Sequence, residues 1–258
     1  MLCRGARVGR SVLLSVTTDH LDTSSDTRAE LGVPAVRLDR RLAAEFVGTA
    51  LLVAIVVGSG IAAQRLTTDT GLQLLANSIA TGAGLVALIL SFASVSGARF
   101  NPLVSLAAVI DGDLDRRDAV AEVSVQVAGG VLGAIVANLM FELPAIEWST
   151  HTRSSGGLWL GEIVATSGLL LVVLGTARSP RLGVPAVAAA VGGYITAAYW
   201  FTSSTSFANP AVTVARMFSD TFAGIEPASV PAFLVAQVVG AALAIILDRY
   251  LHPRSEAT

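Results

Sequence analysis

Long runs of apolar residues, separated by short polar stretches, dominate the chain from about residue 40 onward. Each of six runs approaches the roughly 20 residues that a helix needs to cross the hydrocarbon core of a bilayer. The runs cover Leu42–Ala63, Leu74–Val95, Val120–Met140, Leu158–Gly175, Val184–Trp200 and Val230–Leu247. This pattern predicts six transmembrane helices and therefore an all-α, multi-pass membrane protein.

Two further apolar segments are too short to span a bilayer, and each begins at an Asn-Pro pair. They run from Asn101-Pro102 to about Ile110 and from Asn209-Pro210 to about Phe218. Asparagine is a favourable helix N-cap, and proline is favoured in the first helical turn because its missing N–H would be unpaired there. We therefore expect two half-helices that begin inside the membrane.

Polar residues recur in the same order in the two halves of the chain. The matching pairs are Glu45 and Glu162, Asn101 and Asn209, and Gln126 and Gln237. Because each half contains three predicted spans, an odd number, the second half must be inverted relative to the first. Inverted repeats of this kind place their site near the midplane, where broken helices meet. We assign repeat one to about residues 41–140 and repeat two to about residues 158–248.

Composition supports membrane insertion and excludes several other classes of function. Residues are 53% hydrophobic and only 14% charged, against about 25% charged in a typical soluble domain. All 17 basic residues are arginine and the net charge is −2, which gives no support to nucleic-acid binding. The single cysteine excludes an internal disulfide and a cysteine metal cluster. No nucleophile–base pair or metal-ligand cluster is evident, so we expect no enzyme activity, cofactor or metal.

Arginines are distributed unequally between the predicted loops, and this distribution predicts the orientation in the plasma (cytoplasmic) membrane. With both termini in the cytoplasm, only Arg65, Arg153 and Arg216 fall outside. The inner loops hold Arg37, Arg40, Arg41, Arg99, Arg116, Arg117, Arg178, Arg181, Arg249 and Arg254. We expect a disordered cytoplasmic tail over 1–38, a channel domain over 39–251 and a cytoplasmic tail over 252–258.

Taken together, these motifs resemble the aquaporin (major intrinsic protein) family over about residues 40–250. The resemblance rests on Glu45-x-x-Gly48-Thr49, Ser96–Pro102, Gln126, Glu162-x-x-x-Thr166, Phe207–Ala211 and Gln237. It implies a right-handed bundle of six transmembrane helices with two re-entrant half-helices, one pore in each subunit and a homotetramer.

Two Asn-Pro motifs would meet at the centre of such a bundle, so that the positive ends of both half-helix dipoles coincide. The motifs are Asn101-Pro102-Leu103 and Asn209-Pro210-Ala211. Each asparagine oxygen would cap its helix while its N–H groups face the pore. A neutral solute gains two donors, whereas a cation meets two positive ends and must dehydrate. Leu103 stands where the family usually has alanine, and it either adjusts the pore width or packs beside the pore.

Glu45 and Glu162 are carboxylates within apolar spans, where an ionisable residue is costly and faces a cavity or a polar partner. A proton relay is one interpretation. The resemblance implies another, in which each carboxylate accepts hydrogen bonds from the backbone before a half-helix. We expect this structural role for both glutamates and a similar role, as buried polar groups, for Gln126 and Gln237.

The family's constriction uses four positions counted from the two asparagines, which fall at Thr81, Ala197, Ser206 and Val212. None of these residues is bulky or charged, so the resemblance implies a pore wider than that of a water-selective member. Arg216 lies one helical turn beyond Val212. We expect it to be solvated or paired near the outer surface, with a place in the pore mouth as the alternative. Arg99 is expected at the inner pore mouth.

The sequence thus predicts a passive channel for small uncharged solutes in the lipid bilayer. Asn-Pro-Leu, Asn-Pro-Ala and Val212 resemble a bacterial subgroup associated with arsenic resistance, which implies glycerol-like solutes, arsenite as As(OH)3, and water. An ion-coupled secondary transporter is an alternative, because such proteins also use inverted repeats and broken helices. A water-selective aquaporin is a further alternative.

Overall fold

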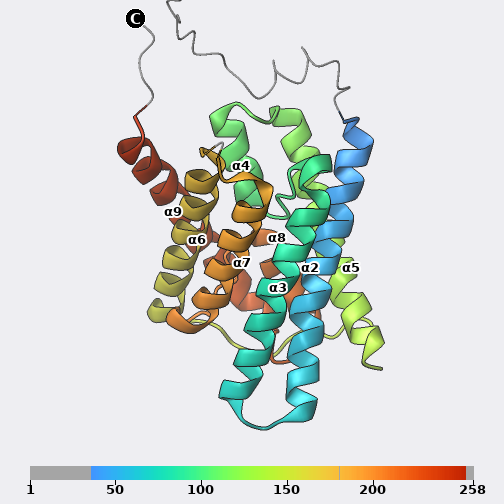
Figure 1. The fold of residues 1–258 in the computed structure, drawn as a ribbon. Coiled ribbons are helices and arrows are strands. Elements are labelled where there is room, and N and C mark those ends of the chain that lie inside the picture. Colours follow the sequence, from blue (N-terminus) through green and yellow to red (C-terminus); the bar gives the residue numbers. More distant parts are fainter. Residues whose placement is uncertain (1–35, 180, 254–258) are drawn as a thin grey trace, which may run out of the picture. The chain divides into compact units, whose positions relative to one another are not determined.

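The computed structural model describes residues 36–179 and 181–253, and all regular structure within them is helical (Figure 1). Six long helices form the bundle: α2 (Leu38–Leu66), α3 (Thr70–Ser96), α5 (Arg116–Met140), α6 (Gly156–Ala177), α7 (Gly183–Phe201) and α9 (Val230–Leu251). All six are long and apolar enough to cross a membrane, which confirms the six predicted spans. The predicted tails lie outside the described residues over 1–35 and 254–258.

Both predicted half-helices are present. Helix α4 (Pro102–Asp111) begins directly after Asn101. Helix α8 (Pro210–Ala215) begins after Asn209 and continues as a 3₁₀ turn, η1 (Arg216–Phe218). A second 3₁₀ turn, η2 (Pro227–Ser229), leads into α9. Each half-helix therefore opens with a capping asparagine followed by proline, the arrangement that leaves the fewest unpaired N–H groups in the first turn.

The two repeats pack in the same way internally and meet through equivalent helices. Helix α2 packs on α3 and α5, and α6 packs on α7 and α9, while α3 contacts α7 across the boundary between the repeats. Gly82 of α3 and Gly192 of α7 lie at that crossing. A Cβ atom on Gly192 would lie 2.6 Å from the carbonyl oxygen of Gly82, so the two backbones approach as closely as only glycine allows.

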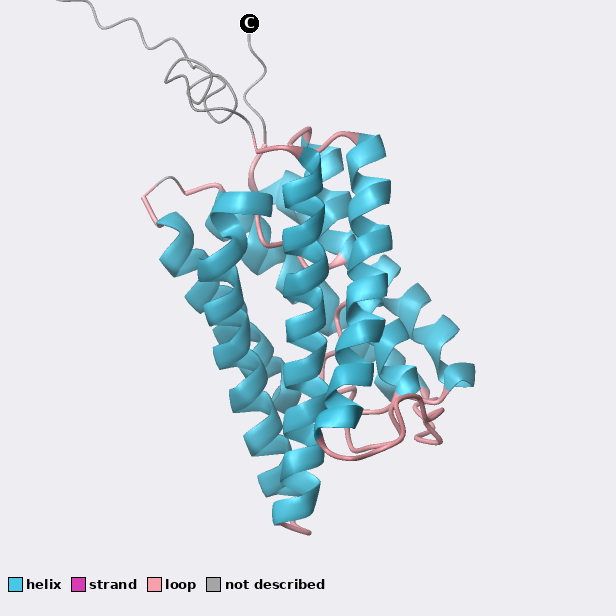
Figure 2. Ribbon diagram, turned by 90° about the vertical axis from the view of Figure 1, so that its right-hand side faces the viewer, coloured by secondary structure: helices cyan, strands magenta, loops and turns pink. Residues whose placement is uncertain are grey.

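The ends of the bundle differ in the number of arginines. Helix α2 begins and α9 ends at the same end of the molecule, and the turn between α2 and α3 lies at the opposite end (Figure 1). We call the former the arginine-rich end, because α2, the loop before α4, and the ends of α6 and α9 place arginines there. These are Arg37, Arg40, Arg41, Arg99, Arg178 and Arg249. Turned by 90° about the vertical axis, the described part of the chain shows helices joined by loops and no strand (Figure 2).

Candidate functional site

Two asparagines, one in each repeat, each form a hydrogen bond with the backbone of the other repeat. The Asn101 Nδ2 group donates to the carbonyl of Ala208 at 2.8 Å, and the Asn209 Nδ2 group donates to the carbonyl of Phe100 at 2.7 Å. Each Oδ1 atom caps its own half-helix. The Oδ1 of Asn101 accepts from the Leu103 N–H at 3.0 Å, and the Oδ1 of Asn209 accepts from the Ala211 N–H at 2.9 Å. An amide has two hydrogens, so the second hydrogen of each side chain finds no acceptor among the described residues.

Two buried carboxylates bind the backbone of the loops that lead to these asparagines. Residues Ala98, Phe100, Ser206 and Ala208 have positive φ angles between 48° and 51°, a conformation that is unfavourable outside glycine. Glu45 accepts from the N–H groups of Arg99 and Phe100 at 3.0 and 2.7 Å. Glu162 accepts from the corresponding N–H groups of Phe207 and Ala208, both at 2.9 Å. These bonds hold the strained backbone, in agreement with the structural interpretation of both glutamates.

Glutamines connect each carboxylate to a half-helix. The Gln126 Nε2 group donates to Glu45 at 2.8 Å and to Ser105 Oγ at 3.1 Å. In the second repeat, the Gln237 Nε2 group donates to Glu162 at 2.6 Å and to the Thr213 hydroxyl at 2.8 Å. All these side chains are fully buried. The same network of acid, amide and hydroxyl is therefore built twice, once in each half of the chain.

A cavity of about 110 Å³ runs past the asparagines. Its walls are mostly apolar and come from both repeats: Leu52, Val56, Leu85, Ile89, Val104, Leu169, Val173, Val187, Val191 and Ile195. The side chains of Asn101 and Asn209 interrupt this apolar surface. Leu103, in contrast, is 4% exposed and packs with Leu170 and Leu174 away from the cavity, so it does not narrow the path.

Three of the four predicted constriction residues line this cavity, and one does not. Thr81, Ser206 and Val212 are lining residues. The prediction for Ala197 is wrong, because this residue lies on an exposed face of α7. Tyr199, two positions further on, lines the cavity, and its hydroxyl lies 3.1 Å from that of Thr81.

Helical phase explains the error at Ala197. The cavity-facing residues of α7 are Val187, Val191, Ile195 and Tyr199, and residues four positions apart share one face of a helix. Position 197 falls between two of these residues and points away from the cavity. Counting back from Asn209 gives a position in the sequence, but it does not give the rotation of α7 about its own axis.

Arg216 takes the placement that was given as the alternative. Its side chain is 2% exposed, lines the cavity and is paired, so only the solvated state expected for it is wrong. The guanidinium carbon lies 3.5 Å from the centre of the Phe207 ring, and Nε donates to the carbonyl of Ala223. The ring and the carbonyl together hold a cation in the wall, one helical turn beyond Val212.

Loop residues on the same side support this arginine. Arg153 donates to the carbonyls of Phe222 and Gly224 at 3.2 and 2.8 Å, on either side of the carbonyl that Arg216 uses. Its guanidinium carbon also lies 5.1 Å from the centre of the Phe207 ring. Two arginines are thus fixed by one aromatic ring and three successive carbonyls.

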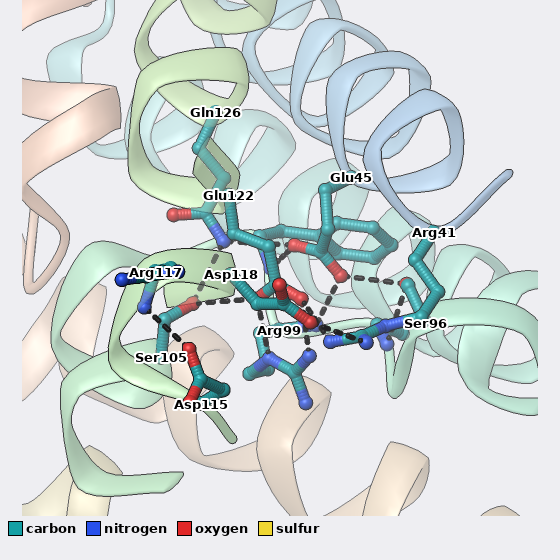
Figure 3. A network of polar contacts seen from close by, with 12 residues as sticks. Arg41, Glu45, Ser96, Arg99, Ser105, Asp115, Arg117, Asp118, Glu122 and Gln126 are labelled. Carbon is teal, nitrogen blue, oxygen red and sulfur yellow. Dashed lines mark hydrogen bonds and ion pairs between the residues drawn. The ribbon is translucent and has the colours of Figure 1, made fainter. Parts of the chain in front are cut away.

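Arg99 lines the cavity at the arginine-rich end, and its partner is a residue that the sequence analysis did not single out (Figure 3). Arg99 donates to both oxygens of Glu122, from Nε at 2.8 Å and from an Nη atom at 2.6 Å. Glu122 is fully buried in α5. Its spacing could have identified it in the sequence, because Glu122 lies one helical turn before Gln126 in an apolar span and so lies on the same face of the helix.

Comparison with known proteins gives consistent results. A family profile described as Major intrinsic protein matches residues 33–185. Aquaglyceroporin AqpS from Rhizobium meliloti (strain 1021) is 52% identical over 214 residues, which cover 83% of this chain and 91% of that protein. Probable aquaporin TIP2-2 from Oryza sativa subsp. japonica is 28% identical over 216 residues, covering 81% and 86%.

Among solved structures, the aquaglyceroporin from Plasmodium falciparum has the same fold. The TM-score is 0.66, with 20% sequence identity, and the match covers 84% of this chain and 98% of that one. Six spanning helices, two Asn-Pro half-helices and these similarities lead to one conclusion: the chain belongs to the major intrinsic protein family, the family of aquaporin and aquaglyceroporin channels.

Proposed function

We propose that the protein is a passive channel for small uncharged solutes. The observation that carries this proposal is the pair of unused amide hydrogens of Asn101 and Asn209, in the wall of a mostly apolar cavity. A hydroxylated solute crossing this surface loses hydrogen bonds to water and regains two at the asparagines. Because the other hydrogen of each amide is bound to the opposite repeat, both donors are fixed in position before the solute arrives.

Cation exclusion follows from the same geometry. The N-termini of α4 and α8 approach one another through the two asparagines, so their positive dipole ends add. A cation entering the cavity would lose its hydration shell among aliphatic side chains and meet no carboxylate there, because Glu45 and Glu162 are fully engaged with the loop backbone and the glutamines. We infer that neutral solutes pass and cations do not.

For the solute, we propose glycerol-sized polyols and arsenite as As(OH)3, together with water. Support comes from the small side chains Thr81, Ser206 and Val212 in the cavity wall and from the 52% identity to a relative that is named an aquaglyceroporin. A second candidate, a water-selective channel, is favoured by a specific observation. Tyr199 and Arg216 also line the cavity and add bulk and one positive charge, in the manner of a narrow water filter.

Ion-coupled transport is less well supported. It requires intramembrane acids whose protonation or ion binding changes during the cycle. Glu45 accepts four hydrogen bonds and Glu162 accepts three. Protonation of either carboxylate, or ion binding to it, would break some of these bonds. We also propose a homotetramer in the cytoplasmic membrane, with the arginine-rich end in the cytoplasm as the distribution of arginines favours.

Solute flux into proteoliposomes tests the function. Water, glycerol, urea and arsenite are compared in stopped-flow or uptake assays, with and without an ion gradient. Fluxes of glycerol and arsenite strictly down their own gradients support the proposal. Water flux alone favours the water-selective candidate, and flux that needs an ion gradient favours the transporter. Replacement of Val212 by arginine should add a second guanidinium at the constriction and suppress glycerol flux more than water flux.

A further inference from the structure

Four charged side chains from α2, α5 and the loop before α4 form a cluster (Figure 3). Glu122 accepts from Arg99 through both oxygens and also from Arg41 at 3.0 Å, and Arg41 binds Asp118 at 3.0 Å. Ser105 of α4 adds a longer hydrogen bond to Glu122 at 3.3 Å. Two arginines and two acids make the cluster electrically neutral, although one of its arginines lines the cavity.

The second repeat shows that the fold does not require charge at these positions. Phe207 precedes Asn209 by two residues, as Arg99 precedes Asn101, and Phe233 precedes Gln237 by four, as Glu122 precedes Gln126. Phe207 and Phe233 contact each other edge to face, with ring centres 5.2 Å apart. Where one repeat has an aromatic pair, the other has a buried ion pair.

Such an ion pair needs a reason beyond packing, because a buried salt bridge is on balance no better for stability than an apolar pair. Arg99 is held at two points. Its backbone N–H binds Glu45 and its guanidinium binds Glu122. The two-bond geometry fixes the plane of the guanidinium against α5, so this long side chain lies along the wall with only 14% of it exposed.

We propose that Glu122 is a positioning residue that keeps Arg99 out of the permeation path and cancels its charge. Without the carboxylate, the guanidinium would be free to swing into the cavity, obstruct it, and present an unpaired cation to anions. This inference rests on the proposed channel function for its flux readout. Its geometric part, the release of Arg99, has a separate readout.

The test compares Glu122→Gln with the double variant Arg99→Ala/Glu122→Gln in proteoliposomes. A charge-assisted hydrogen bond shifts an equilibrium by about tenfold or more, so glycerol flux should fall about tenfold in Glu122→Gln. The double variant should recover most of that flux, because no guanidinium remains to obstruct the path. A purely structural ion pair would also recover when both partners are removed, so flux is compared at equal amounts of folded protein, and flux of folded Glu122→Gln equal to wild type would indicate a structural role alone.

Inorganic phosphate supplies the second readout, since a released guanidinium binds it readily. Millimolar phosphate should lower the flux of Glu122→Gln further and raise its melting temperature in detergent, relative to wild type and to the double variant. Asp118→Asn is the matched control. It removes the same charge from the cluster, but Asp118 contacts Arg41 and not Arg99, so no phosphate response should appear.

Three results would overturn the inference: flux of Glu122→Gln equal to wild type, a double variant as slow as the single one, or a phosphate response equal in Asp118→Asn. If Glu122→Gln does not fold, Glu122→Asp takes its place, because the shorter side chain keeps the charge but cannot make both bonds to Arg99. If wild type conducts no solute, the channel proposal fails, and the melting temperature with phosphate still decides the position of Arg99.

Discussion

Replacement of Glu162 by glutamine is the most informative single change, because it preserves shape and replaces one acceptor oxygen, together with the carboxylate charge, by an NH2 group. In wild type, one carboxylate oxygen accepts from Phe207 N–H, and the other accepts from Ala208 N–H and Gln237. A glutamine has a single acceptor oxygen and places an NH2 group where the second oxygen was. At least one backbone N–H of the loop before α8 must then lose its acceptor.

The magnitude follows from that count. A buried donor without a partner costs about 1–3 kcal/mol, so we expect the free energy of unfolding to fall by at least this amount. The loss falls on Phe207 and Ala208, the second of which has φ 48° and accepts the bond from Asn101. A loop held less firmly should also misplace the pore asparagines, so flux should fall together with stability.

Unfolding by SDS in mixed micelles measures the stability, and stopped-flow on the same preparation measures the flux. Glu147→Gln is the control, because Glu147 is exposed in a loop and the same chemical change there should alter neither quantity. Normal stability with normal flux in Glu162→Gln would refute the structural role. Normal stability with loss of an ion-gradient dependence would instead identify Glu162 as a coupling site.

Further changes test other parts of the structure. Tyr199→Ala should raise glycerol flux relative to water flux in uptake assays, because it removes the ring from the cavity wall, while Ala197→Val on the exposed face should leave the ratio unchanged. Arg216→Leu should raise the sodium leak and not the nitrate leak, because loss of a fixed positive charge lowers the electrostatic barrier to cations alone, and a nitrate leak that rises as much as the sodium leak would contradict a fixed positive charge there. Gly192→Leu should destabilise the bundle by about 1–3 kcal/mol or more in SDS titrations, because its side chain would meet the carbonyl of Gly82.

The sequence was sufficient for the features that depend on local chemistry. Apolar length predicted the six spans, and capping preferences predicted the starts of α4 and α8. The cost of a carboxylate in an apolar span left a proton relay and a backbone partner open for Glu45 and Glu162, and the family resemblance favoured the backbone partner. These arguments need no knowledge of how distant segments meet.

The features that were missed depend on tertiary geometry. Ala197 and Tyr199 differ by two positions on one helix, and only the rotation of α7 in the bundle decides which one faces the cavity. Arg216 is buried because the carbonyl of Ala223 and the ring of Phe207, which belong to other segments, lie against its side chain. Glu122 was passed over because its partner, Arg99, lies on another element, and an ion pair between elements leaves no pattern in the sequence.

The crossed asparagine bonds also constrain the order of folding. The Nδ2 group of Asn101 needs the carbonyl of Ala208, and that of Asn209 needs the carbonyl of Phe100. When the first half of the chain leaves the ribosome, α4 has its own cap but not the bond that fixes its asparagine, because residue 208 has yet to be synthesised. Neither half can complete the centre of the pore alone. We therefore expect the centre of the pore to form late in biogenesis, when the second half docks on the first. Two halves expressed as separate chains should form a working centre only when both are present.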